Sequence, residues 1–145
     1  MAGNYENTPW PQLAAQLGVA PRVHFLGFQR DMPGLMRASD LVVFPSRYEP
    51  FGLVVLEALA SGLPVVTARS TGGAEVMTSD VGFVLDDSED VGALARALSL
   101  LASSDERRAD MAIAARRLAL QYSWRSMATK YLELLENAAG RTAIV

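Results

Sequence analysis

The feature that most constrains the fold is an order of buried strand, loop and helix in the middle of the chain. The run from Leu41 to Phe44 is apolar without alternation, as expected for a parallel strand that is covered on both faces. The apolar segment from Phe51 to Ala60 comes next and is closed by Gly62 and Pro64, which predicts a helix. A second β-branched run, 65–67, then follows. This order predicts an α/β fold with a doubly wound parallel sheet and helices on both faces.

The same patterns along the rest of the chain predict about four strands and a helical C-terminus. The strands are expected at 23–26, 41–44, 65–67 and 82–85. Three helices follow the last strand, and each is expected to begin after a residue that can cap it: Ser88, Ser104 or Asp105, and Ser123. The spacing of apolar residues on the last helix predicts that Trp124 and Tyr131 lie in the core. We expect a single partial domain over residues 1–145, with a frayed tail at 137–145.

Composition and charge argue against several classes of function. A formal net charge of −3 gives no electrostatic attraction toward nucleic acid. The chain has no cysteine and a single histidine, His24, so neither thiolate chemistry nor a zinc site is expected. No apolar run reaches the roughly 18 residues of a membrane span, and no signal peptide opens the chain. We therefore expect a cytoplasmic protein that binds no metal.

Two loops that follow neighbouring predicted strands carry the candidate site residues. Glu49 lies in the first loop, and Gly72 and Gly73 lie in the second. Ligands of such sheets bind beyond the carboxyl ends of the strands, and both loops lead into helices whose N-termini favour phosphate. Glu57 adds a carboxylate within the first helix, where a charge among apolar residues is costly unless it has a partner, and Gly52 leaves room near the backbone. The residues predict a crevice for a phosphate-bearing ligand, with two carboxylates available for its hydroxyl groups.

The segment 45–66 resembles the signature of retaining GT-B glycosyltransferases of family 4, the glycosyl transferases group 1. That signature has one glutamate, seven further residues and a second glutamate, followed by Ala-x-Ala-x-Gly-x-Pro-Val. Here Glu49 and Glu57 are the two glutamates, and Ala58 to Val65 supplies the rest. The segments 23–27 and 82–85 also resemble the C-terminal, nucleotide-sugar-binding domain of that family. The similarity covers roughly residues 13–135 and implies a Rossmann-like sheet.

The resemblance implies a role for each residue of the motif. Glu57 would hydrogen-bond the ribose hydroxyl groups, and Glu49, the catalytic candidate, would touch the donor sugar near the reacting carbon. Backbone N–H groups would hold the sugar and the diphosphate, and the loop 28–31 would lie against the nucleobase. The implied nucleotide-sugar-binding residues are Glu57, Phe51, Gly52, Leu53, Phe28, Gln29, Gly72 and Gly73. The implied reaction transfers a sugar from a nucleotide-diphosphate donor to an acceptor hydroxyl with retention of configuration, without a metal or other cofactor.

The family pattern is incomplete in this chain. The acceptor-binding N-terminal domain of such enzymes is absent, and so are the first strands of the donor-binding domain with the basic residues that neutralise the diphosphate. We therefore expect a fragment that is inactive alone. The strand 23–26 is expected to pair with the strand 41–44 or with another copy of the chain through an exposed sheet edge, giving a homo-oligomer. Any membrane contact, including peripheral attachment of the full-length enzyme to the inner membrane, would come from the absent regions.

Other interpretations stay open. The chain could belong to a sugar-nucleotide epimerase-like GT-B protein, or it could be a non-catalytic nucleotide-binding or assembly module. Glu49 could be an ordinary loop carboxylate, and Glu57 could face solvent. Glu75 and His24 are interpreted as structural. The donor could be UDP-, GDP- or ADP-linked, and neither its sugar nor the acceptor follows from these residues.

Overall fold

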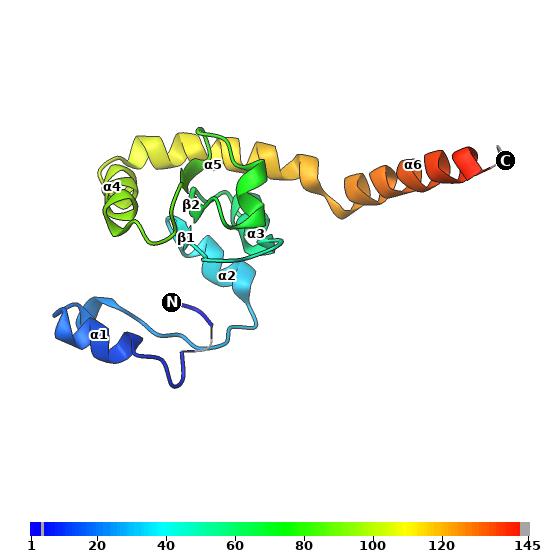
Figure 1. Ribbon diagram of the computed structural model, residues 1–145. Helices are drawn as coiled ribbons and strands as arrows, with labels where there is room; N and C mark the ends of the chain where they lie inside the picture. The colour runs from blue at the N-terminus through cyan, green and yellow to red at the C-terminus, as the bar shows by residue number, and fades with distance from the viewer. Residues whose placement is uncertain (4, 143–145) are drawn as a thin grey trace. The chain divides into compact units, whose positions relative to one another are not determined.

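The computed structural model describes residues 1–3 and 5–142, without the side chains of residues 141 and 142 (Figure 1). Contacts between residues divide the chain into two compact units, Met1–Leu35 and Met36–Val145. The second unit contains the sheet and most of the helices. Each unit is described by itself below, and the prediction of a single partial domain stays a prediction.

A three-stranded parallel sheet forms the centre of the larger unit. Its strands are β1 (Val42–Phe44), β2 (Val65–Ala68) and β3 (Gly82–Leu85), in the order β1-β2-β3. All four residues of β2 are buried. A strand without any exposed position must be covered on both faces, which agrees with the predicted α/β fold. Burial on both faces was expected for the run 41–44, but Val43 in β1 is exposed.

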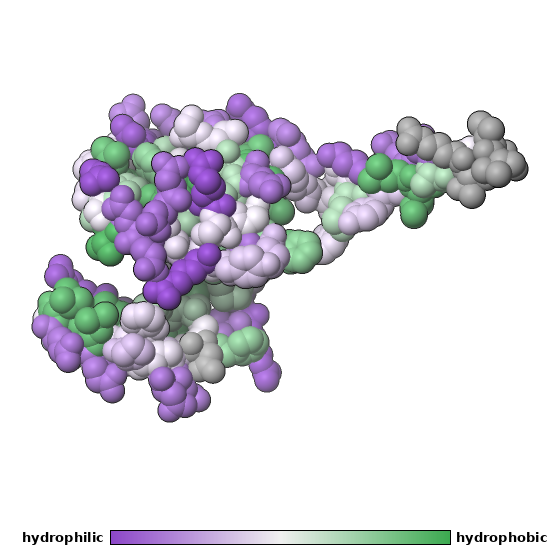
Figure 2. All heavy atoms as spheres, in the orientation of Figure 1, coloured by the Kyte–Doolittle hydropathy of each residue, from purple (hydrophilic) through white to green (hydrophobic). Residues whose placement is uncertain are grey.

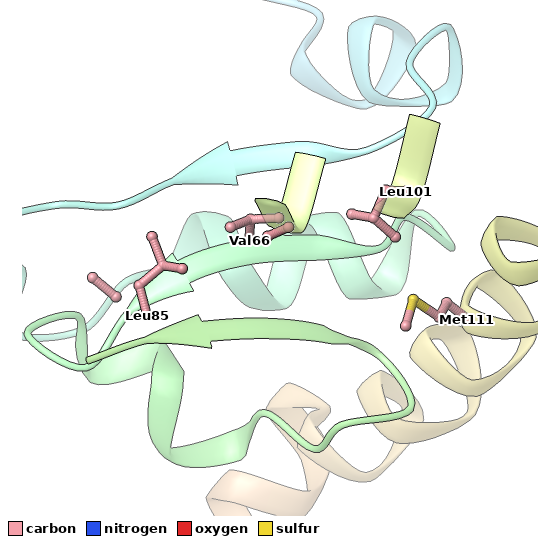
Figure 3. Packing of buried hydrophobic residues seen from close by; sticks show 6 residues of the cluster. Val66, Leu85, Leu101 and Met111 are labelled. Carbon is pink, nitrogen blue, oxygen red and sulfur yellow. The ribbon is translucent and has the colours of Figure 1, made fainter. Parts of the chain in front are cut away.

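The helices follow the expected alternation. In chain order the helical elements are α1 (Trp10–Gln16), η1 (Ala20–Arg22), α2 (Met32–Arg37), α3 (Leu53–Ala60), η2 (Gly72–Val76), α4 (Val91–Ala102), α5 (Asp105–Ala119), η3 (Leu120–Tyr122) and α6 (Trp124–Thr142). Helix α3 joins β1 to β2 and packs against α5. Figure 3 shows α3 and α4 on opposite sides of the sheet, as a doubly wound topology requires.

The hydrophobic core joins one face of the sheet to α4 and α5. Val66 of β2 and Leu85 of β3 lie beside Leu101 of α4 and Met111 of α5 (Figure 3). Val66 and Leu101 have no exposed surface. Because fully burying an aliphatic side chain contributes roughly 1.5–3 kcal/mol, this cluster holds both helices on the sheet.

Side chains cap the last three helices. Ser104 accepts a hydrogen bond from the Arg107 N–H at 3.1 Å, and Ser123 accepts one from the Ser126 N–H at 3.1 Å, as predicted. The cap of α4 is Asp90, whose Oδ1 lies 2.8 Å from the Ala93 nitrogen, so the prediction of Ser88 was wrong by two residues. The residues just before α4 form a turn, in which the Asp90 N–H donates to the Asp87 carbonyl at 3.3 Å.

Among the described residues of the smaller unit, 1–3 and 5–35, none forms a strand, in contrast to the prediction for 23–26. This segment is extended and lies parallel to the first residues of the chain. The Leu26 N–H donates to the Met1 carbonyl at 2.8 Å, the Gly3 N–H donates to the Gly27 carbonyl at 2.8 Å, and an isolated bridge joins Ala2 to Gly27. The sheet therefore has three strands and not four, because the short stretch 1–3 offers too few consecutive partners to make a ladder.

Helix α6 buries less of its apolar side chains than the sequence predicted. Trp124 is 75% exposed and Tyr131 is 61% exposed, so the prediction that they lie in the core was wrong. Figure 2 shows the hydrophobic surface of this helix. The helix continues as far as Thr142. The fraying expected at 137–145 stays a prediction, and residues 143–145 lie outside the described part. In the described ranges, no helix is both long and apolar enough to cross a membrane.

Candidate functional site

The loops after β1 and β2 are tied to each other by their backbones. The Gly72 N–H donates to the Glu49 carbonyl at 2.7 Å, and the Glu49 N–H donates to the Ser70 carbonyl at 3.3 Å. The Ser70 hydroxyl donates to the Ser46 carbonyl at 2.5 Å. These bonds extend the pairing of the strands past their ends, as the isolated parallel bridge between Glu49 and Thr71 records. The structure thus brings together the two loops that the sequence singled out.

Glycines allow this close approach. A Cβ on Gly52 would lie 2.7 Å from Thr71 Cγ2, and a Cβ on Gly73 would lie 2.7 Å from Val55 Cβ. A Cβ on Gly72 would collide with the Pro50 carbonyl. Gly52 also has a φ of 65°, which L-residues rarely adopt. The sequence suggested that these glycines make room for a ligand, and the structure gives them a second role in packing loop against loop.

The carboxylate of Glu49 lies at the N-terminus of α3. Its Oε1 accepts hydrogen bonds from the N–H groups of Phe51 at 3.3 Å and Gly52 at 3.2 Å. Gly52 is the N-cap residue and has no side chain to cap the helix, so Glu49 takes that part from three residues earlier. The N–H groups of Leu53 and Val54 begin the helix and have no acceptor further back in it. This helix end can therefore hold an anion or the oxygen atoms of a polar ligand.

Glu57 projects from the outer face of α3. Val55, Ala58 and Leu59 form the buried face of the helix, and Glu57 is exposed. The expected cost of a charge among apolar residues is therefore avoided by its position on the helix. Glu57 lines a groove of about 250 Å³ that is mainly apolar, together with Leu53, Leu56, Ala60, Ala119, Tyr122, Ser123, Trp124 and Met127. The contacts described for residues 5–142 leave its carboxylate available to a ligand.

Phe28 and Gln29 belong to the other unit, Met1–Leu35. The Phe28 side chain is 83% exposed. The Gln29 Nε2 donates to the Leu26 carbonyl at 2.5 Å, which fixes this loop beside the extended segment. Phe51 is also exposed, at 79%. Two aromatic rings with free faces are thus present among the predicted binding residues.

Two arginines after the strands were missed by the sequence analysis. Arg47 follows β1 and pairs with Glu89, and Arg69 follows β2 and pairs with Asp86 at 2.5 Å. Both guanidinium groups are largely exposed. Their position after neighbouring strands, like that of Glu49 and Gly72, was the signal that could have identified them. In the described part of the chain, no group of three or more His, Cys, Asp or Glu side chains is arranged to hold a metal ion.

Curated relatives are similar to this chain in sequence. D-inositol 3-phosphate glycosyltransferase from Salinispora arenicola is 44% identical over 129 residues, which cover 88% of this chain and 29% of the relative. The protein of the same name from Salinispora tropica is 47% identical over 115 residues, covering 78% of this chain and 24% of the relative. The chain thus spans less than a third of the length of these two relatives.

Solved structures share the fold. Alr3699/HepE from Anabaena, in complex with UDP, superposes with a TM-score of 0.82 at 31% identity, covering 94% of this chain and 40% of that chain. The complex of the same protein with UDP-glucose gives a TM-score of 0.82 at 30% identity. The fold is therefore the Rossmann-like α/β arrangement of these GT-B proteins, with a helical C-terminus. The model of the family described as "Glycosyl transferases group 1" matches residues 1–118. Since that match covers most of the chain, including both glutamates and both loops, this protein belongs to the glycosyl transferases group 1 family.

Proposed function

We propose that this chain is the donor-binding part of a glycosyltransferase. In this proposal the whole enzyme transfers a sugar from a nucleotide-diphosphate donor to an acceptor hydroxyl and retains the anomeric configuration. The donor is a UDP-sugar, which is the ligand class of the Anabaena neighbour. The acceptor site lies in a part of the enzyme outside these 145 residues.

The observation that carries the proposal is the start of α3. The Phe51 and Gly52 N–H groups donate to the Glu49 carboxylate there, those of Leu53 and Val54 have no acceptor further back in the helix, and the positive end of the helix dipole favours the diphosphate. In a sugar transfer, negative charge develops on the diphosphate as it leaves. Preorganised N–H groups stabilise such charge because they need not reorient during the reaction. We assign no metal ion to this step, because the backbone N–H groups stabilise the charge on the diphosphate.

The two glutamates then have separate roles along the same helix. Glu57, about one turn into α3, accepts hydrogen bonds from the ribose hydroxyl groups, because its carboxylate is exposed beside a groove. Glu49 lies at the helix start, where the sugar follows the diphosphate, and accepts from a sugar hydroxyl. The Gly72 N–H holds the Glu49 carbonyl in place, and Gly73 packs closely against Val55 of α3.

Calorimetric titration with UDP, GDP and ADP tests the proposal, with Glu57→Ala as the variant. We expect the chain to bind UDP in preference to the other two, and Glu57→Ala to bind it about tenfold more weakly, the effect of one lost charge-assisted pair of hydrogen bonds. Glu133→Ala removes an exposed glutamate from α6 and serves as the matched control. Equal binding by Glu57→Ala and the control would refute the ribose-binding role.

We further propose that the chain alone transfers no sugar. The chain spans less than a third of the length of the two curated relatives, so we place the acceptor site outside it, and the arginines that follow β1 and β2 are already paired with acidic residues. A radiolabel assay with UDP-glucose and a panel of polyol acceptors should give no product above background. Product formation by the isolated chain would contradict this part of the proposal.

A further inference from the structure

We propose that Glu49 makes the donor site select a sugar-bearing nucleotide over the bare nucleoside diphosphate. The inference rests on the proposed function and assigns Glu49 a part in specificity as well as in contact with the sugar. Its basis is that the Glu49 carboxylate already occupies N–H groups at the start of α3. Any ligand that uses these groups must first displace the carboxylate.

The hydrogen bonds that hold the carboxylate are weak enough to exchange. They measure 3.3 Å to Phe51 and 3.2 Å to Gly52, whereas charge-assisted N–H···O bonds are typically about 2.7–2.9 Å long. Glu49 is half-buried, so its carboxylate keeps access to solvent. The carboxylate therefore acts as a loosely bound internal ligand.

The backbone of Glu49 cannot move away with its side chain. Its N–H donates to the Ser70 carbonyl, and its carbonyl accepts from the Gly72 N–H. Thr71 of the same loop after β2 packs against Gly52. Only rotation of the side chain can free the N–H groups. A displaced carboxylate thus stays within a side-chain length of whatever ligand takes its place.

Because the carboxylate stays close, it interacts differently with a bare nucleoside diphosphate and with a nucleotide sugar, which differ in charge. The terminal phosphate of a bare nucleoside diphosphate carries more negative charge than the phosphate of a sugar diester, and it meets an anion that has nowhere else to go. A nucleotide sugar instead presents hydroxyl groups that donate to the displaced carboxylate. Glu49 thereby disfavours the product of transfer and favours the donor. The arginines that follow β1 and β2 are paired with Glu89 and Asp86.

The test measures the affinities of UDP and UDP-glucose for the wild-type chain and for Glu49→Gln, with the GDP and ADP pairs in parallel. We expect Glu49→Gln to bind UDP about tenfold more tightly, because its side chain carries no negative charge to repel the phosphate and competes less strongly for the N–H groups. UDP-glucose should bind equally or more weakly, so the ratio of the two affinities falls. Glu106→Gln removes the same charge in the first turn of α5 and should leave both affinities within about twofold.

A second measurement needs no ligand. Hydrogen exchange of the Phe51 and Gly52 amides should be faster in Glu49→Gln and faster still in Glu49→Ala, with circular dichroism confirming that both variants fold. Unchanged hydrogen exchange in both variants would overturn the inference, and so would unchanged or weaker UDP binding by Glu49→Gln. In either case the proposed function would still stand if UDP binding is lost in Glu57→Ala. Failure of every variant to bind any nucleotide would overturn both. Binding of UDP by Glu49→Gln where the wild type shows none would support both.

Discussion

Thr67 and Thr71 are both buried at the single-residue scale, but they differ in hydrogen bonding. The Thr67 hydroxyl donates to the Phe44 carbonyl at 2.9 Å, which joins β2 to β1. The Thr71 hydroxyl has no partner within the described ranges, although the residue is only 1% exposed. A buried hydroxyl without a partner costs about 1–3 kcal/mol relative to an apolar group of the same shape. The loop contact with Gly52 is made by the methyl group, which valine would keep.

We predict opposite effects for the same substitution at these two positions. Thr71→Val should raise the free energy of unfolding by about 1 kcal/mol, and Thr67→Val should lower it by about 1 kcal/mol because the Phe44 carbonyl loses its donor. Urea denaturation of both variants checks the prediction. A loss of stability in Thr71→Val would mean that its hydroxyl is satisfied, for example by a bound water.

We predict that Gly52→Ala is far more damaging than Gly62→Ala. Both glycines have positive φ, 65° and 74°, so both variants incur backbone strain of about 1 kcal/mol. At Gly52 the added Cβ also meets Thr71 and the Gly73 backbone, whereas at Gly62 the nearest atom is 3.6 Å away. Overpacking adds roughly 1–3 kcal/mol. Similar melting temperatures for the two variants would show that the loops can separate without cost.

The sequence could predict that the loops after β1 and β2 meet, but not how they meet. Glu49 and Gly72 were brought together by a general property of parallel sheets, whose strand ends share one edge. The contact of Gly52 with Thr71 joins residues far apart in sequence and depends on the loop conformations, which no local pattern encodes. The capping of α3 by Glu49 was missed for the same reason, since its position three residues before the N-cap residue fits no standard capping pattern.

At the scale of elements, strands with continuous apolar sequence were predictable and the short segment 23–26 was not. The strands of the sheet appear within a residue or two of the predicted ranges, although only β2 among them is buried at every position. The segment 23–26 has strand-like residues, yet a strand exists only with a partner ladder. Its partner here is the short stretch 1–3. Pairing depends on the rest of the chain and is not a property of the segment.

We predict that Asp90, and not Ser88, stabilises α4. Asp90→Ala should lower the free energy of unfolding by about 1 kcal/mol, because the Ala93 N–H loses its acceptor and the helix dipole loses a favourable charge. Ser88→Ala should change it by no more than about 0.5 kcal/mol, as is usual for surface substitutions. Thermal denaturation of both variants makes the comparison. Equal losses would indicate that the helix begins earlier than Val91.

At the scale of the whole molecule, the two units differ in how much apolar surface they bury. Among the described residues of Met1–Leu35, Ala14 is the buried hydrophobic side chain, at 7% exposure, whereas the larger unit buries a full cluster around β2. Units below about 40 residues rarely hold a stable core without a disulfide, a metal or a partner. The smaller unit therefore depends for its stability on more than its own side chains.

We predict that this difference appears in hydrogen exchange. Amides bonded within Met1–Leu35, such as those of Leu26 and Gly3, should exchange at least about 100-fold faster than those of β2, which corresponds to about 2.7 kcal/mol in opening free energy. Mass spectrometry of peptides from both units measures the ratio. Comparable protection would show that the chain opens as one cooperative unit.

The interlock between the loops after β1 and β2 couples their lengths over evolutionary time. One residue inserted into either loop would move Gly72 away from the Glu49 carbonyl or bring a side chain against Thr71. Neither loop can thus lengthen unless the other changes with it. Insertions and deletions should instead gather in connections that make no such contact with another loop. The same contacts that place Glu49 therefore determine where homologous chains can differ in length.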